Sequence, residues 1–219
     1  MRIRLRWWRE IFFLCALLFS LAALLPLRIA LDRLGFAEKG LAAREAEGSL
    51  WLGTLTEARF GTVALGDVAT RLRFLPLLVG RARLDLEQPD DGLRGSFTVS
   101  RHGFGIDDAT GSFEAPELPN LPRPMLDLAD FSFRFGDGLC AEAGGLVKAR
   151  FTGDVAGMPL TASLSGQPRC DGQALLLPLA SQTSADRLDI RIFADGRYRV
   201  DAALRLGEMP YSGRFDGSF

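Results

Sequence analysis

The chain has 219 residues, of which 47% are hydrophobic and 24% are charged, a composition typical of folded globular proteins and not of disordered chains. The formal net charge is −1, so no basic excess points to nucleic acid as a partner. The basic residues are unevenly placed, however. Four arginines, Arg2, Arg4, Arg6 and Arg9, lie in the first nine residues, and the chain after Glu10 carries 22 basic and 26 acidic side chains.

An uncharged apolar segment follows the arginines and spans residues 11–27. At about 1.5 Å per residue, a helix of this length spans roughly 26 Å, close to the thickness of a bilayer hydrocarbon core. Trp7 and Trp8 before the segment suit the headgroup layer, and Arg28 after it can reach water from the far side. We therefore expect a transmembrane anchor over residues 11–31.

The charge asymmetry predicts the orientation of this anchor. By the positive-inside rule, residues 1–10 stay in the cytoplasm as a basic N-terminus, and the chain beyond the anchor is exported. The alternative is a cleaved signal peptide, with Ser20-Leu21-Ala22 as the cleavage site. The apolar run is longer than a usual signal segment, which favours a retained helix and a single-pass membrane protein.

Beyond residue 47, short runs of alternating apolar and polar side chains replace helical periodicity. Residues 188–193 and 198–206 alternate in this way and are joined by Asp195-Gly196, a pair typical of a type I′ hairpin turn. Residues 84–100 predict a second hairpin, and Phe131 to Phe135 alternate with polar residues as well. The pattern predicts a mainly β fold: a predominantly antiparallel, curved β-sheet or a β-sandwich-like domain.

Prolines suggest a division of this β-domain. Four prolines lie between residues 116 and 124, a density of missing N–H donors that regular sheet does not tolerate. We expect a Pro-rich linker over residues 115–124, between one β-half over residues 38–114 and another over residues 125–219. Apart from the anchor, the one short helix expected lies around residues 76–80.

The three cysteines support export. Cys15 lies inside the apolar segment and is expected to be a small apolar residue there. Cys140 and Cys170 form an even pair in the exported part, where an oxidising compartment favours a disulfide over a metal site. Two free buried thiols are the alternative.

Recognisable catalytic chemistry is missing from the sequence. The single histidine, His102, lies in a turn-like stretch without a partner motif, and no phosphate-binding loop, HExxH helix or CxxC pair occurs. Asp107-Asp108 could suggest a cation site, but its glycine neighbours favour a turn. We therefore predict no catalytic residue, metal or cofactor, and a protein that is not an enzyme.

Trp51 stands out because two glycines, Gly48 and Gly53, bound the apolar stretch that contains it. Tryptophan dominates many protein interfaces, so this segment could be a docking anchor. Tryptophan burial also stabilises folds, and glycines permit close backbone approach. The second interpretation, a core tryptophan at the start of the sheet, is favoured.

Taken in chain order, these features resemble the type II secretion system protein N family, also called general secretion pathway protein N. The resemblance rests on the basic N-terminus and single anchor, the Gly48–Trp51–Gly53 segment, the stretch LPLLVG at residues 75–80, and the cysteine pair. It implies a bacterial inner-membrane accessory subunit with most of the chain in the periplasm. Its implied partners are other inner-membrane platform or secretin subunits of the machine that exports folded proteins across the outer membrane.

A looser resemblance is to AsmA-like envelope proteins, which place a curved β-groove behind an N-terminal anchor and handle lipids. That resemblance implies lipid binding or lipid transfer as the alternative function. A lipid groove should present a continuous apolar concave face, whereas a secretion subunit should present a docking patch. The sequence alone leaves both open.

Overall fold

The computed structural model describes residues 11–14, 16–17, 20, 26–33, 35–61, 63–89, 92–115, 122–155, 158–183, 185–206 and 209–218. Arg2, Arg4, Arg6, Trp7, Trp8 and Arg9 lie outside the described residues, as does Cys15. Within the described part of the chain, no helix is both long and apolar enough to cross a membrane.

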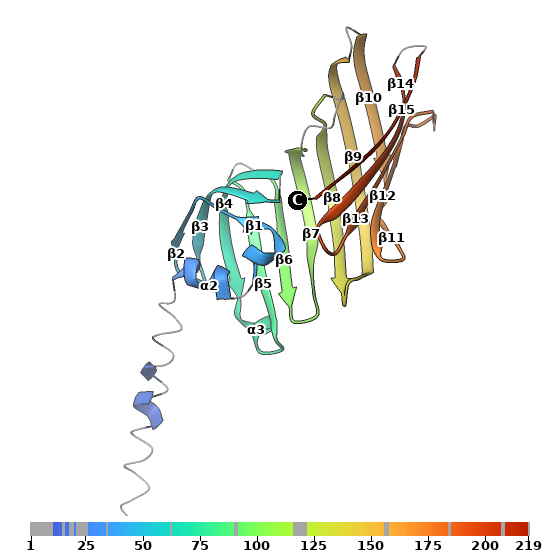
Figure 1. Ribbon diagram of the computed structural model, residues 1–219. Helices are drawn as coiled ribbons and strands as arrows, with labels where there is room; N and C mark the ends of the chain where they lie inside the picture. Colours follow the sequence, from blue (N-terminus) through green and yellow to red (C-terminus); the bar gives the residue numbers. More distant parts are fainter. Residues whose placement is uncertain are drawn as a thin grey trace, which may run out of the picture.

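Strands make up most of the described chain, and the helical segments are short and lie before β6 (Figure 1). The elements are α2 (Leu27–Arg33), η1 (Ala37–Lys39), β1 (Leu41–Ala42), β2 (Glu45–Gly48), β3 (Gly53–Phe60), β4 (Val63–Arg73), α3 (Phe74–Leu77), β5 (Arg81–Glu87), β6 (Arg94–Ser100), β7 (Gly103–Glu114), β8 (Met125–Gly136), β9 (Leu139–Val155), β10 (Met158–Gly166), β11 (Arg169–Asp171), β12 (Ala174–Ala180), β13 (Arg187–Phe193), β14 (Arg197–Leu206) and β15 (Met209–Ser218).

These strands form one continuous antiparallel sheet. Its order is β1-β3-β4-β5-β6-β7-β8-β9-β10-β12-β13-β14-β15, with β2 beside β3 and β11 beside β12. From β3 to β10, and again from β12 to β15, each strand pairs with the next one in sequence, so the chain meanders along a single twisted sheet (Figure 1). The mainly antiparallel β fold is confirmed; of the two architectures expected, the described residues form the curved sheet.

Bulges bend this sheet. The pairing register shifts between β6 and β7 and, where the bulged residues are clearest, between β3 and β4, between β7 and β8, and between β8 and β9. Each of these strand pairs has a shift at a non-glycine residue with positive φ, whose backbone N–H donates to a side-chain oxygen of a neighbouring strand: Glu57 to Asp67 (3.0 Å), Asp108 to Ser132 (2.9 Å) and Asp130 to Thr110 (3.2 Å). Because a bulge adds a residue to one strand only, it increases the local twist and curls the sheet.

Two buried apolar clusters lie along the sheet. The first lies within residues 27–99 and includes Phe36 and Phe97; the second lies within residues 109–204 and includes Phe151. Phe104 and Ile106 of β7 pack against both clusters.

The segment 115–124 joins β7 to β8, and these two strands pair directly. Both sides of the expected linker are therefore part of one sheet. The division into two halves stays a prediction.

The two predicted hairpins are present. β13 and β14 pair as expected and are joined through Gly196, whose φ of +84° favours glycine because it has no Cβ. β5 pairs with β6, and Phe131 to Phe135 lie in β8 with their rings buried. The short helix expected around residues 76–80 is α3, which begins slightly earlier, at Phe74.

The start of the β-domain includes residues from the end of the expected anchor segment. Pro26 forms a β-bridge with Ser49, and the side chain of Leu27 in α2 is fully buried. Leu27 and Leu31, within the segment 11–31 that the sequence predicts to be an anchor, pack in the first apolar cluster, and the bounds of the anchor stay a prediction. The reason for this packing is local: proline interrupts helix geometry, and Gly53 leaves room for the Leu27 side chain.

Candidate functional site

One face of the sheet is apolar, and it is hollowed into a groove. Successive side chains of a strand point to opposite faces, so the alternation seen in the sequence places leucine, isoleucine and phenylalanine on one side. A cavity of about 690 Å³ lies on this side and is lined by residues of β3 to β9 and β12 to β14. Pockets of roughly 300–1,000 Å³ with mainly apolar walls are typical of ligand sites. The groove is therefore the candidate functional site.

Aromatic rings join the two apolar clusters along the groove. The ring of Phe104 lies 6.5 Å from that of Phe97 in β6 and 5.4 Å from that of Phe135 in β8, measured between centroids. The rings of Phe133 and Phe135 are 5.6 Å apart. Because these separations are typical of favourable aromatic contacts, the groove has a continuous apolar wall where β6, β7 and β8 meet.

Few polar groups line the groove. Its charged lining residues, among those described, are Glu38, Lys39, Arg94 and Asp195. The amine of Lys39 lies 5.4 Å from the centre of the Phe104 ring, a cation–π contact. The hydroxyl of Ser96 donates to the Asp85 carboxylate at 2.7 Å and is therefore already bonded. A bound molecule with many hydrogen-bonding groups would leave most of them unpaired here, at a cost in free energy.

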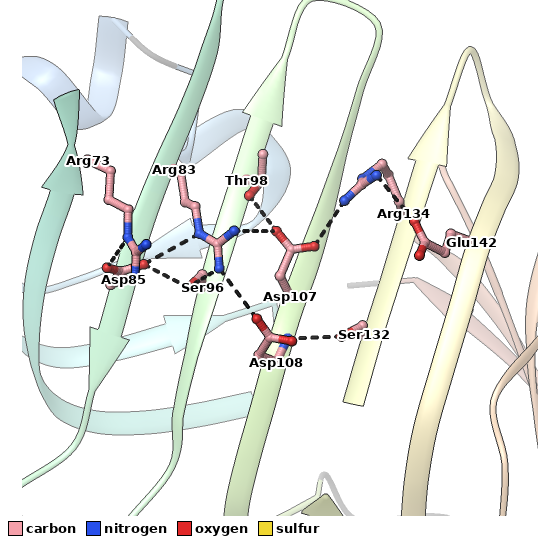
Figure 2. Close-up of polar contacts among 10 residues, drawn as sticks. All are labelled: Arg73, Arg83, Asp85, Ser96, Thr98, Asp107, Asp108, Ser132, Arg134 and Glu142. Atoms are coloured by element: carbon pink, nitrogen blue, oxygen red, sulfur yellow. Dashed lines mark hydrogen bonds and ion pairs between the residues drawn. The ribbon is translucent and has the colours of Figure 1, made fainter. Parts of the chain in front are cut away.

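The opposite face carries a network of alternating charges across β4, β5, β7, β8 and β9, as Figure 2 shows. The ion pairs join Arg73 to Asp85 (2.7 Å), Arg83 to Asp107 (3.6 Å), Arg134 to Asp107 (3.1 Å) and Arg134 to Glu142 (3.2 Å). Asp107 is the most buried of these groups, and the hydroxyl of Thr98 also donates to it at 2.9 Å. These ion pairs and hydrogen bonds link neighbouring strands, so the network helps to hold the sheet together.

The same network corrects one sequence interpretation. Asp107 and Asp108 lie within β7 and not in a turn, and Arg83 contacts both carboxylates. No group of three or more potential metal ligands occurs among the described residues. His102 does lie in a turn, between β6 and β7, where its Nδ1 is 3.4 Å from a carboxylate oxygen of Asp137.

The structure joins Cys140 and Cys170 by a disulfide, with the two Cα atoms 5.4 Å apart. Cys140 is in the first part of β9, and Cys170 is in β11. β10 pairs with β9 only from residue 147 onward, so residues 139–146 have no β10 partner. β11 lies beside this part of β9, and the disulfide links the two strands.

Trp51 packs against the edge of the first apolar cluster and is half-buried there. Its ring lies 5.8 Å from that of Phe74 in α3. The two glycines beside it have backbone roles. Gly48 has a φ of +88°, and a Cβ on Gly53 would come within 2.6 Å of Leu27. A half-buried ring suits both interpretations of this segment, so whether Trp51 also anchors a partner stays a prediction.

Sequence reasoning found most groove-lining strands but not the groove. Alternation at Leu188 and Ile190 indicates which side chains share a face within one strand. It does not indicate which faces of β4, β8 and β13 line one cavity, because that depends on register and on the bulges. The signal that was available is that apolar positions recur on one face of successive strands across residues 84–204.

Comparison with known proteins gives the family. The family model described as "Type II secretion system (T2SS), protein N" matches residues 39–211, which include every strand from β2 to β14. A relative named "Type II secretion system protein N", from Vibrio cholerae serotype O1 (strain ATCC 39315 / El Tor Inaba N16961), is 26% identical over 211 residues, covering 87% of this chain and 82% of the relative. No solved structure matches the chain. The chain belongs to the type II secretion system protein N family.

Proposed function

We propose that this chain is a non-enzymatic inner-membrane accessory subunit of the type II secretion system that supports export of folded proteins across the outer membrane. The family match over residues 39–211 carries the proposal, because it covers nearly the whole sheet and not one local motif. The arginine-rich start and the apolar segment 11–27 support a location in the inner membrane with the sheet in the periplasm. Its partners are other platform subunits or the secretin.

A second candidate function, carriage of a lipid acyl chain, is favoured by the groove. Neighbouring strands lie about 4.8 Å apart, so the ten strands β4–β10 and β12–β14 extend the sheet over roughly 43 Å, longer than an extended acyl chain needs. A peptide in the groove would bury N–H and C=O groups with few partners, whereas an acyl chain has none to satisfy. An amphiphile with its chain in the groove is therefore the occupant that suits the lining.

The two candidates predict different phenotypes when the gene is deleted. If the chain supports secretion, proteins normally released through the type II pathway accumulate in the periplasm, and the lipid composition of the outer membrane is unchanged. A primary change in outer-membrane lipid with normal secretion would reject the secretion role and favour lipid carriage. Complementation with the full chain is the control for both readouts.

The lipid candidate also has a direct test in the groove. Leu128 of β8 lines the groove, while Ala129, the next residue, is exposed and outside it. Full-length protein purified from membranes is extracted, and its bound lipid is measured by mass spectrometry. Leu128→Glu should lose the lipid because it places a charge among apolar side chains, and Ala129→Glu should retain it. Equal lipid content in both variants would reject the groove as a lipid site.

A further inference from the structure

Exposed apolar side chains gather at one end of the sheet. From Gly35 onward, the large apolar side chains that the described chain exposes are Leu52, Phe74, Leu75, Leu78, Val79 and Leu139. Leu52 lies in the turn before β3, residues 74–79 form the connection between β4 and β5, and Leu139 begins β9. These three connections all lie at the same end of the sheet. The start of β3 pairs with the end of β4, through Gly53 and Thr70. The end of β8, from which the chain turns into β9, pairs with the start of β7, through Gly136 and Gly103.

Five of these side chains form one projecting surface, which we call the apolar tip: Leu52, Phe74, Leu75, Leu78 and Val79. Their exposed fractions run from 56% to 76%, with Leu75 the most exposed. The contact between the rings of Trp51 and Phe74 places the turn before β3 directly beside α3. Soluble monomeric proteins seldom expose so concentrated an apolar surface unless it contacts a partner or a membrane.

The chain enters the domain at this same end. Pro26, the first described residue after the apolar sequence 11–25, pairs with Ser49, three residues before Leu52. Figure 1 shows α2 and α3 both at the lower end of the sheet. A bilayer that holds residues 11–25 would therefore lie next to the apolar tip. Trp51 suits such a boundary, since an indole is stable where apolar and hydrated layers meet.

Charged side chains flank the tip without entering it. Arg81 begins β5 just after Val79, and Arg101 lies in the turn between β6 and β7; both are exposed. Long arginine side chains at such a level can reach lipid phosphates while the apolar side chains lie deeper. Arg73 of the charge network, which pairs with Asp85, lies directly before Phe74 and is exposed, so it is a third arginine beside the tip.

We propose that the apolar tip inserts into the outer part of the phospholipid bilayer that the N-terminal segment crosses, and that it fixes the sheet at the membrane surface. The inference rests on the proposed inner-membrane location. Apolar side chains at an interface typically lie about 5–10 Å below the headgroups, a depth that the short connection around α3 can reach without unfolding a strand. The two contacts, anchor and tip, restrict how the sheet and its groove are oriented over the membrane.

The test measures the depth of one side chain in the full chain. Leu75→Cys, made in a Cys15→Ala background with the Cys140–Cys170 disulfide intact, is labelled with an environment-sensitive fluorophore. The protein is reconstituted into phosphatidylethanolamine–phosphatidylglycerol vesicles, with or without lipids that carry a quencher on the acyl chain. The matched control is Glu87→Cys, an exposed position at the opposite end of β5.

The proposal predicts that emission from position 75 shifts to shorter wavelength and is lost with quencher lipid, while emission from position 87 changes in neither respect. Adding Val79→Glu should reduce quenching at position 75 and leave the melting temperature unchanged, because Val79 is 73% exposed. If the protein floats with vesicles but position 75 is not quenched, the tip proposal is wrong and the anchor stands. If the protein does not float, both are wrong. Equal quenching at both positions would mean general adsorption and would also overturn the proposal.

Discussion

Gly53 controls how closely α2 approaches the sheet. A Cβ at this position would come 2.5 Å from the carbonyl oxygen of Glu47 and 2.6 Å from Leu27, closer than such atoms approach in folded proteins. Gly136 is a matched control, because a Cβ added there would meet no atom within 4 Å. Because Gly53 has only a hydrogen as its side chain, Leu27 can lie buried beside it; the neighbouring tryptophan does not provide this space.

We expect Gly53→Ala to lower the free energy of unfolding by about 1–3 kcal/mol, the usual cost of overpacking. Gly136→Ala should change it by less than about 1 kcal/mol. Urea unfolding of the full chain in detergent micelles measures both. Equal effects of the two substitutions would show that the contact with Leu27 does not limit the packing of α2.

Asp127 makes a second residue-level prediction. The hydroxyl of Ser112 donates to its carboxylate at 2.6 Å, and Arg150 pairs with it at 2.9 Å; the Ser112 hydrogen bond is the main cause of a lowered pKa, which partial burial opposes. A carboxyl group whose pKa is lower in the folded than in the unfolded chain stabilises the fold at pH values above its pKa in the unfolded chain, which is about 3.9 for aspartate. That contribution is lost as the pH falls through the lowered value.

Asp127→Asn should therefore lower the melting temperature at pH 7, and the difference from the parent protein should shrink as the pH falls below about 4. Ser112→Ala should show the same trend with smaller amplitude, because the contact with Arg150 remains. Thermal unfolding monitored by circular dichroism from pH 7 to pH 3 makes the comparison. A difference that stays constant across this range would contradict the assignment.

Among the elements, β11 depends on a covalent link more than on pairing. It has three residues, pairs only with β12, and lies beside the part of β9 that β10 does not reach. The Cys140–Cys170 disulfide holds it there. Cys140→Ala and Cys170→Ala should each lower the free energy of unfolding by about 2–5 kcal/mol, and the double substitution should be little worse than either one.

Thiol alkylation checks this disulfide in protein taken from cells. Neither Cys140 nor Cys170 should react until a reductant is added under denaturing conditions. Ready labelling of both residues without reductant would contradict the link. Because disulfides form in oxidising compartments, protection of the pair also supports an exported domain.

The elements differ in how well sequence predicts them. The β13–β14 hairpin was predictable because Asp195-Gly196 separates two alternating runs, and β8 because its phenylalanines recur every second residue. The bulge at Asp108 was not, since an aspartate with positive φ depends on an acceptor, Ser132, 24 residues away. For the same reason the sequence of Asp107-Asp108 suggests a turn where the structure has a bulged strand.

At the scale of the whole molecule, the groove was the least predictable feature. Each strand shows which of its side chains share a face, but the cavity forms only when β3 to β14 curve together, and their curvature depends on the bulges. The half-burial of Trp51 also depends on a contact between segments far apart in the sequence, because α3 lies beside the turn before β3. The exposed apolar tip likewise depends on the contact between α3 and the turn after β2, which are more than twenty residues apart in sequence.

The orientation of the whole chain is also testable. The charge asymmetry between residues 1–10 and the rest of the sequence predicts that the sheet lies in the periplasm. A reporter active only in the periplasm should be active when fused after Phe219, and a reporter active only in the cytoplasm should be silent there. The reverse pattern would contradict the topology. Recovery of Trp7 and Trp8 in the mature protein would exclude signal-peptide cleavage.

The central claim is that this sheet works as a subunit of the type II secretion machine. The most direct measurement uses the affinity-tagged full chain, expressed at its native level and purified from membranes in mild detergent. Quantitative mass spectrometry then identifies the proteins that purify with it. The account predicts enrichment of type II inner-membrane platform or secretin subunits over a tagged unrelated single-pass membrane protein. If those subunits are abundant in the solubilised membranes and none is enriched with the chain, the proposed function is contradicted.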